Sequence, residues 1–333
     1  MTRLDLENLG AAARAERERL DGYKAMLMVC TGTGCVSAKA FSIRDGLQAA
    51  LEKRGLERDF LVVGTGCNGF CGQGPVLVVQ PEGIFYQKLR TDDVERIVDE
   101  HLAGGEPVEA LMFCDADGDR PIAKMEDIPF FSKQKLIALR NKGLVDPESL
   151  DSYIERGGYR ALVRALRELA PADVLAEVET SALRGRGGGG FPTGVKWASC
   201  RAAVEKTGER PVVVCNADEG DPGAFMDRSI IETDPHTVIE GMLLGAYAVG
   251  AFEGFVYIRK EYPLAVARLE KALAQARERG LLGERVLGTD FRFDIVVHRG
   301  AGAFVCGEST ALMASMEGRV GEPRAKYIHN VES

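Results

Sequence analysis

The length, composition and charge of the chain exclude several classes of protein. Its 333 residues are enough for two or three domains, and 45% hydrophobic with 28% charged residues is typical of globular proteins. The net charge of −8 argues against a nucleic-acid-binding surface. Residues 1–21 are too charged for a signal peptide, and the most apolar run, residues 242–252, is too short to cross a bilayer. We therefore expect a cytoplasmic protein that binds no nucleic acid and has no direct membrane span.

The first third of the chain has the pattern of a small domain with both helices and strands. In chain order, we expect a charged helix over residues 4–20, a strand over 24–29, a helix over 38–54, a strand over 60–63, a hairpin over 76–80 and 84–88, and a helix over 92–102. Gly55 ends the second helix, and Pro81 and Gly83 form the hairpin turn. This order is that of a thioredoxin-like domain, which we place at residues 23–106. It follows an N-terminal helix at residues 1–22.

The rest of the chain predicts a connector followed by an α/β domain. In the connector, residues 107–170, we expect short helices over 136–140, 147–157 and 159–169. In the second domain, residues 171–333, we expect helices over 171–183, 196–206, 236–251, 263–280 and 308–316, and strands over 212–215, 254–258 and 291–298. Strands that alternate with helices imply a mostly parallel sheet with helices on its faces.

Four of the eight cysteines are grouped in two pairs, and each pair follows a predicted strand in a glycine-rich loop. The four are Cys30, Cys35, Cys67 and Cys71. Glycines let backbone N–H groups approach cluster sulfides, and four thiolates complete a [2Fe–2S] site. Structural zinc sites usually have tighter cysteine spacing, and a redox dithiol needs only one pair. We expect these cysteines to bind a [2Fe–2S] cluster, with zinc and an inert relic of a site as the alternatives.

A second candidate site is the glycine-rich stretch over residues 183–197, where six of residues 185–194 are glycine. Bare backbone N–H groups beside basic side chains such as Lys196 suit a phosphate. A flexible linker is the alternative, but linkers seldom contain Phe191 and Trp197. The stretch follows a predicted helix rather than a strand and lacks Gly-Lys-Ser/Thr, so it is neither a Rossmann fingerprint nor a Walker A loop. We expect a phosphate or flavin cradle of another design.

Two polar segments follow predicted strands of the second domain. The first holds an amide and three acids, Asn216, Asp218, Glu219 and Asp221. Ligands of open α/β sheets bind at the carboxyl ends of strands, where these groups would bind hydroxyls, ring nitrogens or an amide. A solvated acidic turn is the alternative. The second segment, residues 300–309, contains Glu308, which would either bind a ligand's sugar or favour a helix N-terminus.

Residues 184–197, 215–219 and 300–308 closely resemble the FMN- and NADH-binding flavoprotein subunit of respiratory complex I, together with the related subunits of NAD-linked hydrogenases and formate dehydrogenases. The resemblance covers about residues 136–322, and the N-terminal module is similar to the one fused in hydrogenase- and formate-dehydrogenase-type members. It implies a Rossmann-like α/β domain that transfers hydride between NAD(P)H and FMN. Single electrons would then pass through iron–sulfur clusters.

The resemblance also implies the roles of individual residues. It implies that FMN is lined by Gly185, Gly187, Lys196, Asn216, Asp218, Glu219 and Gly307, and that NADH is faced by Phe191, Asp221 and Glu308. Arg186, Gly188 and Ser309 complete the expected cofactor-binding set. Phe191 would stack on the nicotinamide ring. No catalytic acid, base or nucleophile is expected, because the cofactors perform the chemistry.

The sequence departs from the family at several positions. Asp221 replaces a usual Glu, Phe304 a frequent Tyr, and Ser309 a frequent second Glu. A carboxylate beside the adenosine ribose would bind its hydroxyls and repel a 2′-phosphate, so we expect Ser309 to weaken the preference for NADH over NADPH. The ligands of the family's [4Fe–4S] cluster are absent from this chain, so we expect the flavin domain to be incomplete at its C-terminal end.

The resemblance implies partners as well as cofactors. These are NADH and the other subunits of a hydrogenase- or formate-dehydrogenase-type complex, namely a small thioredoxin-like [2Fe–2S] subunit and an iron–sulfur or catalytic subunit. One alternative is the NADH-input module of a membrane quinone reductase. Another is a non-catalytic electron-transfer or assembly subunit, against which the intact glycine stretch and Asn216, Asp218 and Glu219 argue.

Overall fold

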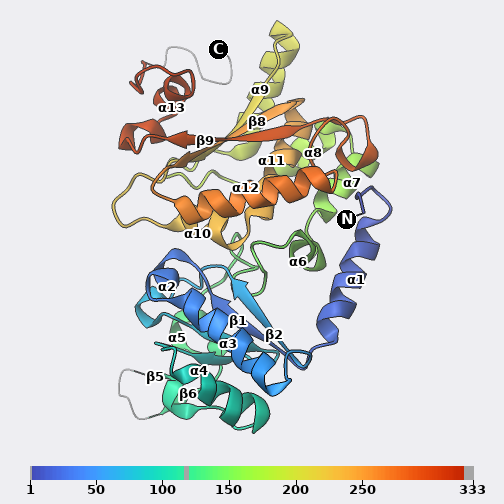
Figure 1. Ribbon diagram of the computed structural model, residues 1–333. Helices are drawn as coiled ribbons and strands as arrows, with labels where there is room; N and C mark the ends of the chain where they lie inside the picture. The colour runs from blue at the N-terminus through green and yellow to red at the C-terminus, as the bar shows by residue number, and fades with distance from the viewer. Residues whose placement is uncertain (1, 116–119, 326–333) are drawn as a thin grey trace. The chain divides into compact units, whose positions relative to one another are not determined.

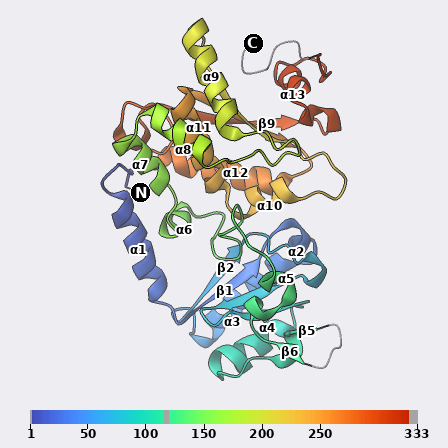
Figure 2. The ribbon, with the colours of Figure 1, turned by 180° about the vertical axis from the view of Figure 1, so that it is seen from behind.

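The structure, a computed structural model, describes residues 2–115 and 120–325. The chain divides into two compact units, seen from opposite sides in Figures 1 and 2. One unit comprises Ala12–Arg156 with Glu232–Asp234, and the other comprises Met1–Ala11, Gly157–Ile231 and Pro235–Ser333. Within the described ranges, every helix is too short or too polar to cross a lipid bilayer.

The unit that contains Ala12–Arg156 is built on a four-stranded sheet with the order β2-β1-β3-β4. Its strands are β1 (Ala25–Cys30), β2 (Phe60–Thr65), β3 (Leu77–Gln80) and β4 (Ile84–Tyr86). β1 runs parallel to β2, with Ala25 opposite Phe60, and antiparallel to β3, with Met26 opposite Gln80. β3 and β4 form the predicted hairpin. The predicted order of elements is therefore confirmed.

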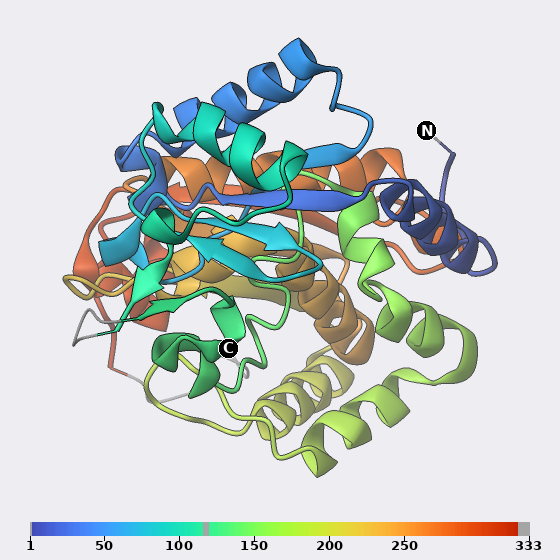
Figure 3. The same ribbon diagram turned by 90° about the horizontal axis from the view of Figure 1, so that it is seen from below.

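Two helices cover one side of this sheet (Figure 3). They are α3 (Ala40–Arg54) and α4 (Asp93–Arg96), which continues as the π-helix η2 (Ile97–Ala103). α3 buries Ile43, Leu47 and Leu51, which are spaced four residues apart and so lie on one face of the helix. Gly55 ends α3 in the left-handed conformation with φ 67°, as its position after the last apolar residue predicts.

The segment expected to be a connector extends this sheet. Bridges from Tyr86 to Met112 and from Ile84 to Lys124 attach it to β4, and β5 (Phe113–Cys114) pairs with β6 (Pro121–Ile122). The remaining helices in this part of the chain are α1 (Leu9–Asp21), α2 (Thr33–Ser37), α5 (Pro129–Ser132) and α6 (Leu150–Glu155). The helix predicted over residues 136–140 is wrong. These residues form turns, because Leu136 and Ile137 are exposed and bury no face that would stabilise a short helix.

The other unit contains a parallel three-stranded sheet with the order β7-β8-β9. The strands are β7 (Val212–Ala217), β8 (Glu253–Arg259) and β9 (Asp294–Gly300), joined by the crossover helices α11 (Pro235–Val249) and α12 (Pro263–Glu278). Right-handed crossovers between successive neighbouring strands place both helices on one face of the sheet, where they contact each other. The predicted parallel sheet is confirmed, but the crossover helices pack on one of its faces and not on both.

The opposite face of this sheet is only partly covered. Val212, Val214 and Val296 lie on it and are each about half exposed. The first crossover also contains α10 (Met226–Thr233), and the helices outside the two crossovers are α7 (Arg160–Glu168), α8 (Pro171–Thr180), α9 (Thr193–Thr207) and α13 (Ser309–Met316). The sequence did not predict α10. α8 ends three residues earlier than predicted, just before Ala182 takes a positive φ of 53°.

Candidate cofactor sites

The first site is formed by the four grouped cysteines. Cys30 ends β1 and Cys35 lies in α2, whereas Cys67 follows β2 and Cys71 begins a short 3₁₀ turn. Because β1 and β2 are parallel neighbours, their carboxyl ends bring the two loops together. Cys30, Cys35 and Cys67 are buried, and Cys71 is exposed.

Glycines allow these two loops to approach each other. A Cβ on Gly32 would lie 3.2 Å from Cys67 Sγ, and one on Gly34 would lie 2.9 Å from Cys71 Sγ. On the other side, a Cβ on Gly74 would lie 2.8 Å from Cys35 Sγ. A side chain at any of these positions would press against a sulfur atom. The loop glycines therefore keep the space around the cysteines clear, as a cluster requires.

Hydrogen bonds connect the thiols to each other and to the backbone. The bond between Cys30 and Cys35 is the main reason why the pKa of Cys30 rises to about 12 and that of Cys35 falls. The pKa of Cys67 is also raised, first by its bond with Cys30 and then by burial. The N–H of Gly69 donates to Cys67 Sγ at 3.3 Å. Backbone donors of this kind stabilise thiolate ligands.

The donor set fits a [2Fe–2S] cluster better than a single metal ion. The four cysteines come as two pairs, one from each of two adjacent loops. A [2Fe–2S] cluster is held by two such pairs of thiolates. The buried amide of Asn68, directly after Cys67, has no hydrogen-bond partner on either polar atom.

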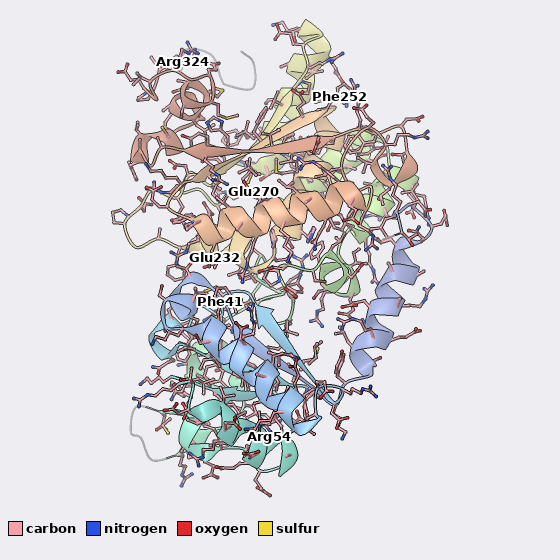
Figure 4. All side chains as sticks on the ribbon, in the orientation of Figure 1. Phe41, Arg54, Glu232, Phe252, Glu270 and Arg324 are labelled. Atoms are coloured by element: carbon pink, nitrogen blue, oxygen red, sulfur yellow. The ribbon has the colours of Figure 1, made fainter. Side chains whose placement is uncertain are left out.

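A short segment far away in the sequence also contacts these loops, and sequence reasoning missed it. The buried carboxylate of Glu232 (Figure 4) accepts from the backbone N–H of Thr33 at 2.9 Å and from its hydroxyl at 2.5 Å. Thr233 Oγ1 accepts from the N–H of Cys67 at 3.1 Å. A Cβ on Gly66 would stand 2.3 Å from the Cα of Thr233, so only glycine permits this approach.

The second candidate site begins with the glycine-rich stretch between α8 and α9. Its two ends pair, with the N–H of Gly185 bonded to the carbonyl of Phe191 at 2.9 Å. The exposed tip between them includes Arg186, Gly187 and Gly188, and nothing lies within 4 Å of a Cβ added at either of these two glycines. Phe191 itself is 56% exposed. The loop is therefore fixed at its base and open at its tip.

The carboxyl end of β7 supplies the polar groups predicted to bind a ligand. The Asn216 amide donates to the carbonyl of Gly307 at 2.8 Å, which joins two of the predicted segments. The Asp218 side chain is only 1% exposed, and neither of its oxygens has a hydrogen-bond partner. Burial raises the pKa of Asp218. Arg259 Nη1 lies 3.6 Å from Asp218 Oδ1, a distance too long for a good hydrogen bond.

The neighbouring acids are engaged differently. The Glu219 carboxylate accepts from the backbone N–H groups of Asp227 and Arg228 at 3.0 Å and 3.2 Å, and so caps the start of α10. Asp221 is exposed and begins a turn, in which its carbonyl accepts from the N–H of Ala224 at 3.1 Å. Glu219 therefore caps a helix and Asp221 begins a turn, whereas the carboxylate of Asp218 accepts no hydrogen bond.

The segment after β9 places Glu308 at the start of α13. Its carboxylate accepts from the N–H groups of Thr310 and Ala311 at 2.8 Å and 3.1 Å, which is the helix-capping role, one of the two roles expected for it. Ser309 Oγ lies 3.3 Å from Glu308 Oε1. A Cβ on Gly307 would lie 3.2 Å from the Asp218 carbonyl oxygen, so this glycine permits the two segments to meet.

A cavity of about 480 Å³ lies between α9, the partly covered face of β7 and α13. Lys196, Asn216 and Ser309 line it beside Trp197 and apolar residues. Three of the predicted site residues are therefore brought to one cavity. The tip of the glycine-rich loop and Phe191 do not line it.

Sequence reasoning missed Arg259 and the position of Phe304 in this second site. A Cβ on Gly220 would lie 3.0 Å from Arg259 Nη1 and 2.7 Å from Phe304 Cδ2, so both side chains stand directly on the acidic loop. Arg259 ends β8, the parallel neighbour of β7. Arg259 could have been predicted as a site residue, because ligands bind at the carboxyl ends of neighbouring parallel strands and Arg259 ends one of them.

Each part of the chain matches a family of known proteins. Residues 19–102 match the thioredoxin-like [2Fe–2S] ferredoxin family, and residues 178–333 match the Nuo51 FMN-binding domain. These matches confirm the predicted fold class, a thioredoxin-like [2Fe–2S] domain followed by an α/β FMN-binding domain. The [2Fe–2S] and FMN assignments follow from the same two matches.

Several relatives are similar to the chain over part of their length. An NADP-reducing hydrogenase subunit, HndC of Solidesulfovibrio fructosivorans, is 56% identical over 194 residues, covering 58% of this chain and 39% of that protein. An NADH-quinone oxidoreductase subunit of Rhizobium meliloti (strain 1021) is 50% identical over 190 residues, covering 57% and 44%. A solved NAD+-reducing [NiFe]-hydrogenase in the air-oxidized state aligns with 96% of this chain and 50% of its own, at 25% identity and a TM-score of 0.44. The chain spans about two fifths of the length of the first two relatives.

Proposed function

This chain joins a thioredoxin-like [2Fe–2S] ferredoxin domain to a Nuo51 FMN-binding domain, and on that premise we propose that it is the flavoprotein subunit of a multisubunit oxidoreductase. It transfers hydride between NAD(P)H and FMN and passes single electrons through its cluster to partner subunits. FMN supplies the conversion between a two-electron hydride and single electrons. Relatives named for NADP reduction and for NADH–quinone oxidoreduction support this class of reaction.

The observation that carries the proposal is the unsatisfied carboxylate of Asp218. A buried carboxylate without donors is costly, and a ligand that brings hydroxyl or N–H groups removes that cost. FMN carries both kinds of donor. Asp218 sits where ligands of open α/β sheets bind, beyond the carboxyl end of β7 and beside Gly307.

The other predicted residues have complementary roles in this proposal. The open backbone at Gly187 and Gly188, with Arg186, binds the phosphate of FMN. Lys196 supplies positive charge from α9. Phe191, more than half exposed, offers a ring face to the nicotinamide. Each of these side chains binds or orients a cofactor, and none takes part in a covalent step.

We also propose a cellular location and partner subunits for this chain. We place the protein in the cytoplasm, because its eight cysteines, all of which lie in the described ranges, form no disulfides, and thiols persist in reducing compartments. Other iron–sulfur subunits receive the electrons, as subunits of a hydrogenase- or formate-dehydrogenase-type complex do. A serine at position 309 accommodates the 2′-phosphate of NADPH better than the family's glutamate.

Substitution of Asp218 tests the proposal directly. Asp218→Asn keeps the size of the side chain and removes the charge that attracts FMN donors. We expect it to weaken FMN binding at least tenfold, about 1.4 kcal/mol. The matched control is Asp290→Asn, which removes the same charge from a fully exposed side chain of the same unit. FMN fluorescence quenching measures both dissociation constants.

The FMN affinities of the two variants decide whether Asp218 binds the flavin. FMN affinity that falls for Asp218→Asn and stays unchanged for Asp290→Asn supports the site. Equal FMN affinity in wild type and Asp218→Asn, with both proteins folded, would refute the assignment of Asp218. A wild-type protein that binds no FMN would refute the proposed function itself.

A further inference from the structure

A buried lysine lies beside the cysteine loops without a carboxylate partner. Lys142 is only 7% exposed. In the part of the chain that the structure describes, no Asp or Glu forms an ion pair with its ammonium group. Burying a charge without a counter-ion is costly, so such a lysine indicates a negative partner that the polypeptide itself does not supply.

The ammonium group lies against the loop of the second cysteine pair. Lys142 Nζ is 5.7 Å from the ring centroid of Phe130 and 5.6 Å from that of Phe131. A Cβ added to Gly69 would stand only 2.9 Å from Nζ. Gly69 is the residue whose N–H donates to Cys67 Sγ at 3.3 Å. The cation is therefore held between two aromatic rings and the backbone that binds a cysteine sulfur.

The charge of Lys142 acts on cysteines of both loops. Burial lowers the pKa of Lys142, whereas Cys67, Cys30 and Cys71, in that order, act to raise it by Coulomb attraction. The attraction is mutual, so the ammonium group stabilises negative charge on three of the four expected ligands. Glu232 acts in the opposite direction, since its carboxylate raises the pKa of Cys67.

We propose that Lys142 raises the reduction potential of the [2Fe–2S] cluster held by the four cysteines. Reduction adds one electron, and hence one negative charge, to a group that four thiolates already make negative. A buried cation lowers the free energy of the more negative state further, because Coulomb energy grows with charge. In the cell the electron comes from the reduced flavin of the proposed function. No bond forms or breaks, and no proton moves.

The test is a potentiometric titration of the cluster, followed by its electron paramagnetic resonance signal in the anaerobically reconstituted protein. Lys142→Met removes the charge and keeps the length, Lys142→Gln removes it and keeps a polar end, and Lys142→Arg keeps the charge. Lys133→Met is the matched control, because Lys133 is an exposed lysine of the same unit. The inference depends on the cluster part of the proposed function and not on FMN, which is left out of the titration.

We expect both neutral variants to shift the redox equilibrium toward the oxidised cluster at least tenfold, which is about 59 mV to lower potential. Lys142→Arg and Lys133→Met should stay within threefold of wild type. An intact cluster with an unchanged potential in Lys142→Met or Lys142→Gln would overturn the inference. So would a cluster that assembles in Lys142→Arg and in neither neutral variant, because the lysine would then have a structural role. A wild-type protein that assembles no cluster would instead refute the proposed cluster site.

Discussion

Three carboxylates within four residues of each other meet three different environments after β7. Asp218 is buried without a donor, Glu219 is bonded to the backbone of α10, and Asp221 is exposed at a turn. A carboxylate whose oxygens are already occupied gains little from a ligand, whereas one buried without donors gains most. FMN affinity should therefore depend on Asp218 more than on its two neighbours.

A fourth acidic residue of this region, Asp227, should make the stability of the fold depend on pH. Burial, with a smaller contribution from Glu219, raises the pKa of Asp227 from 3.8 to about 6. Asp227 lies in the first turn of α10, where the helix dipole favours a negative charge, but burial outweighs that effect on the pKa. Because the folded state holds this proton more tightly than the unfolded state, stability contributed by Asp227 is lost as the pH rises from about 4 to about 6. Partial exposure limits the effect to about 1 kcal/mol.

Asp227→Asn should remove this dependence. We expect the variant to be about 1 kcal/mol more stable than wild type at pH 7 and nearly equal to it at pH 4. Thermal unfolding of the cofactor-free protein across that range measures the difference, with the exposed Asp290→Asn as the control. A variant that is less stable than wild type at pH 7 would contradict the assigned burial of Asp227.

Single site residues were predictable from sequence only where a local pattern marks them. The four cysteines and Asn216 lie at the ends of strands or in the loops that follow them, and the apolar runs of those strands are visible in the sequence. Lys142 and Thr233 reach the cysteine loops only through tertiary packing, and no spacing connects them to those cysteines. Arg259 was predictable only in part. The sequence predicts the strand that it ends, β8, but not the contact of its side chain with the acidic loop.

At the scale of elements, the packing of α8 against α9 depends on one glycine. A Cβ on Gly194 would lie 2.5 Å from the Cγ of Glu179 and 2.7 Å from its backbone nitrogen. We expect Gly194→Ala to cost about 1–3 kcal/mol through overpacking and to lower the melting temperature by several degrees. Differential scanning fluorimetry measures this change.

Gly187→Ala is the matched variant from the same stretch. Nothing lies within 4 Å of a Cβ at this position, so the melting temperature should stay at the wild-type value. FMN affinity should fall, because the new methyl group occupies space that the phosphate needs. A destabilised Gly187→Ala, or one with wild-type FMN affinity, would contradict the assignment of this loop as the cradle.

Regular elements were predictable where burial agrees with the local pattern. The strands of both sheets, the helices α3, α11 and α12, and the hairpin of β3 and β4 follow from apolar periodicity and from caps such as Gly55. The expected helix over 136–140 was wrong because its apolar residues are not buried in the fold. α10 was missed because it begins directly after a turn at Gly223, and β5 and β6 are only two residues long.

At the scale of the whole molecule, two redox domains share one chain. The family matches cover residues 19–102 and 178–333, and residues 107–115 and 120–132 between them extend the first domain rather than merely linking it to the second. The resemblance seen in the sequence motifs agreed with these matches. The terminal electron partner could not be predicted, because its recognition depends on surfaces that leave no short motif in the sequence.

The central claim is that this chain passes electrons between a nicotinamide and a bound flavin. The most direct measurement is an anaerobic titration of the FMN- and cluster-loaded protein with NADH, followed by the visible absorbance of the flavin. We predict that about one NADH per FMN bleaches the flavin absorbance. Bound FMN that dithionite bleaches, but that neither NADH nor NADPH does, would contradict the claim.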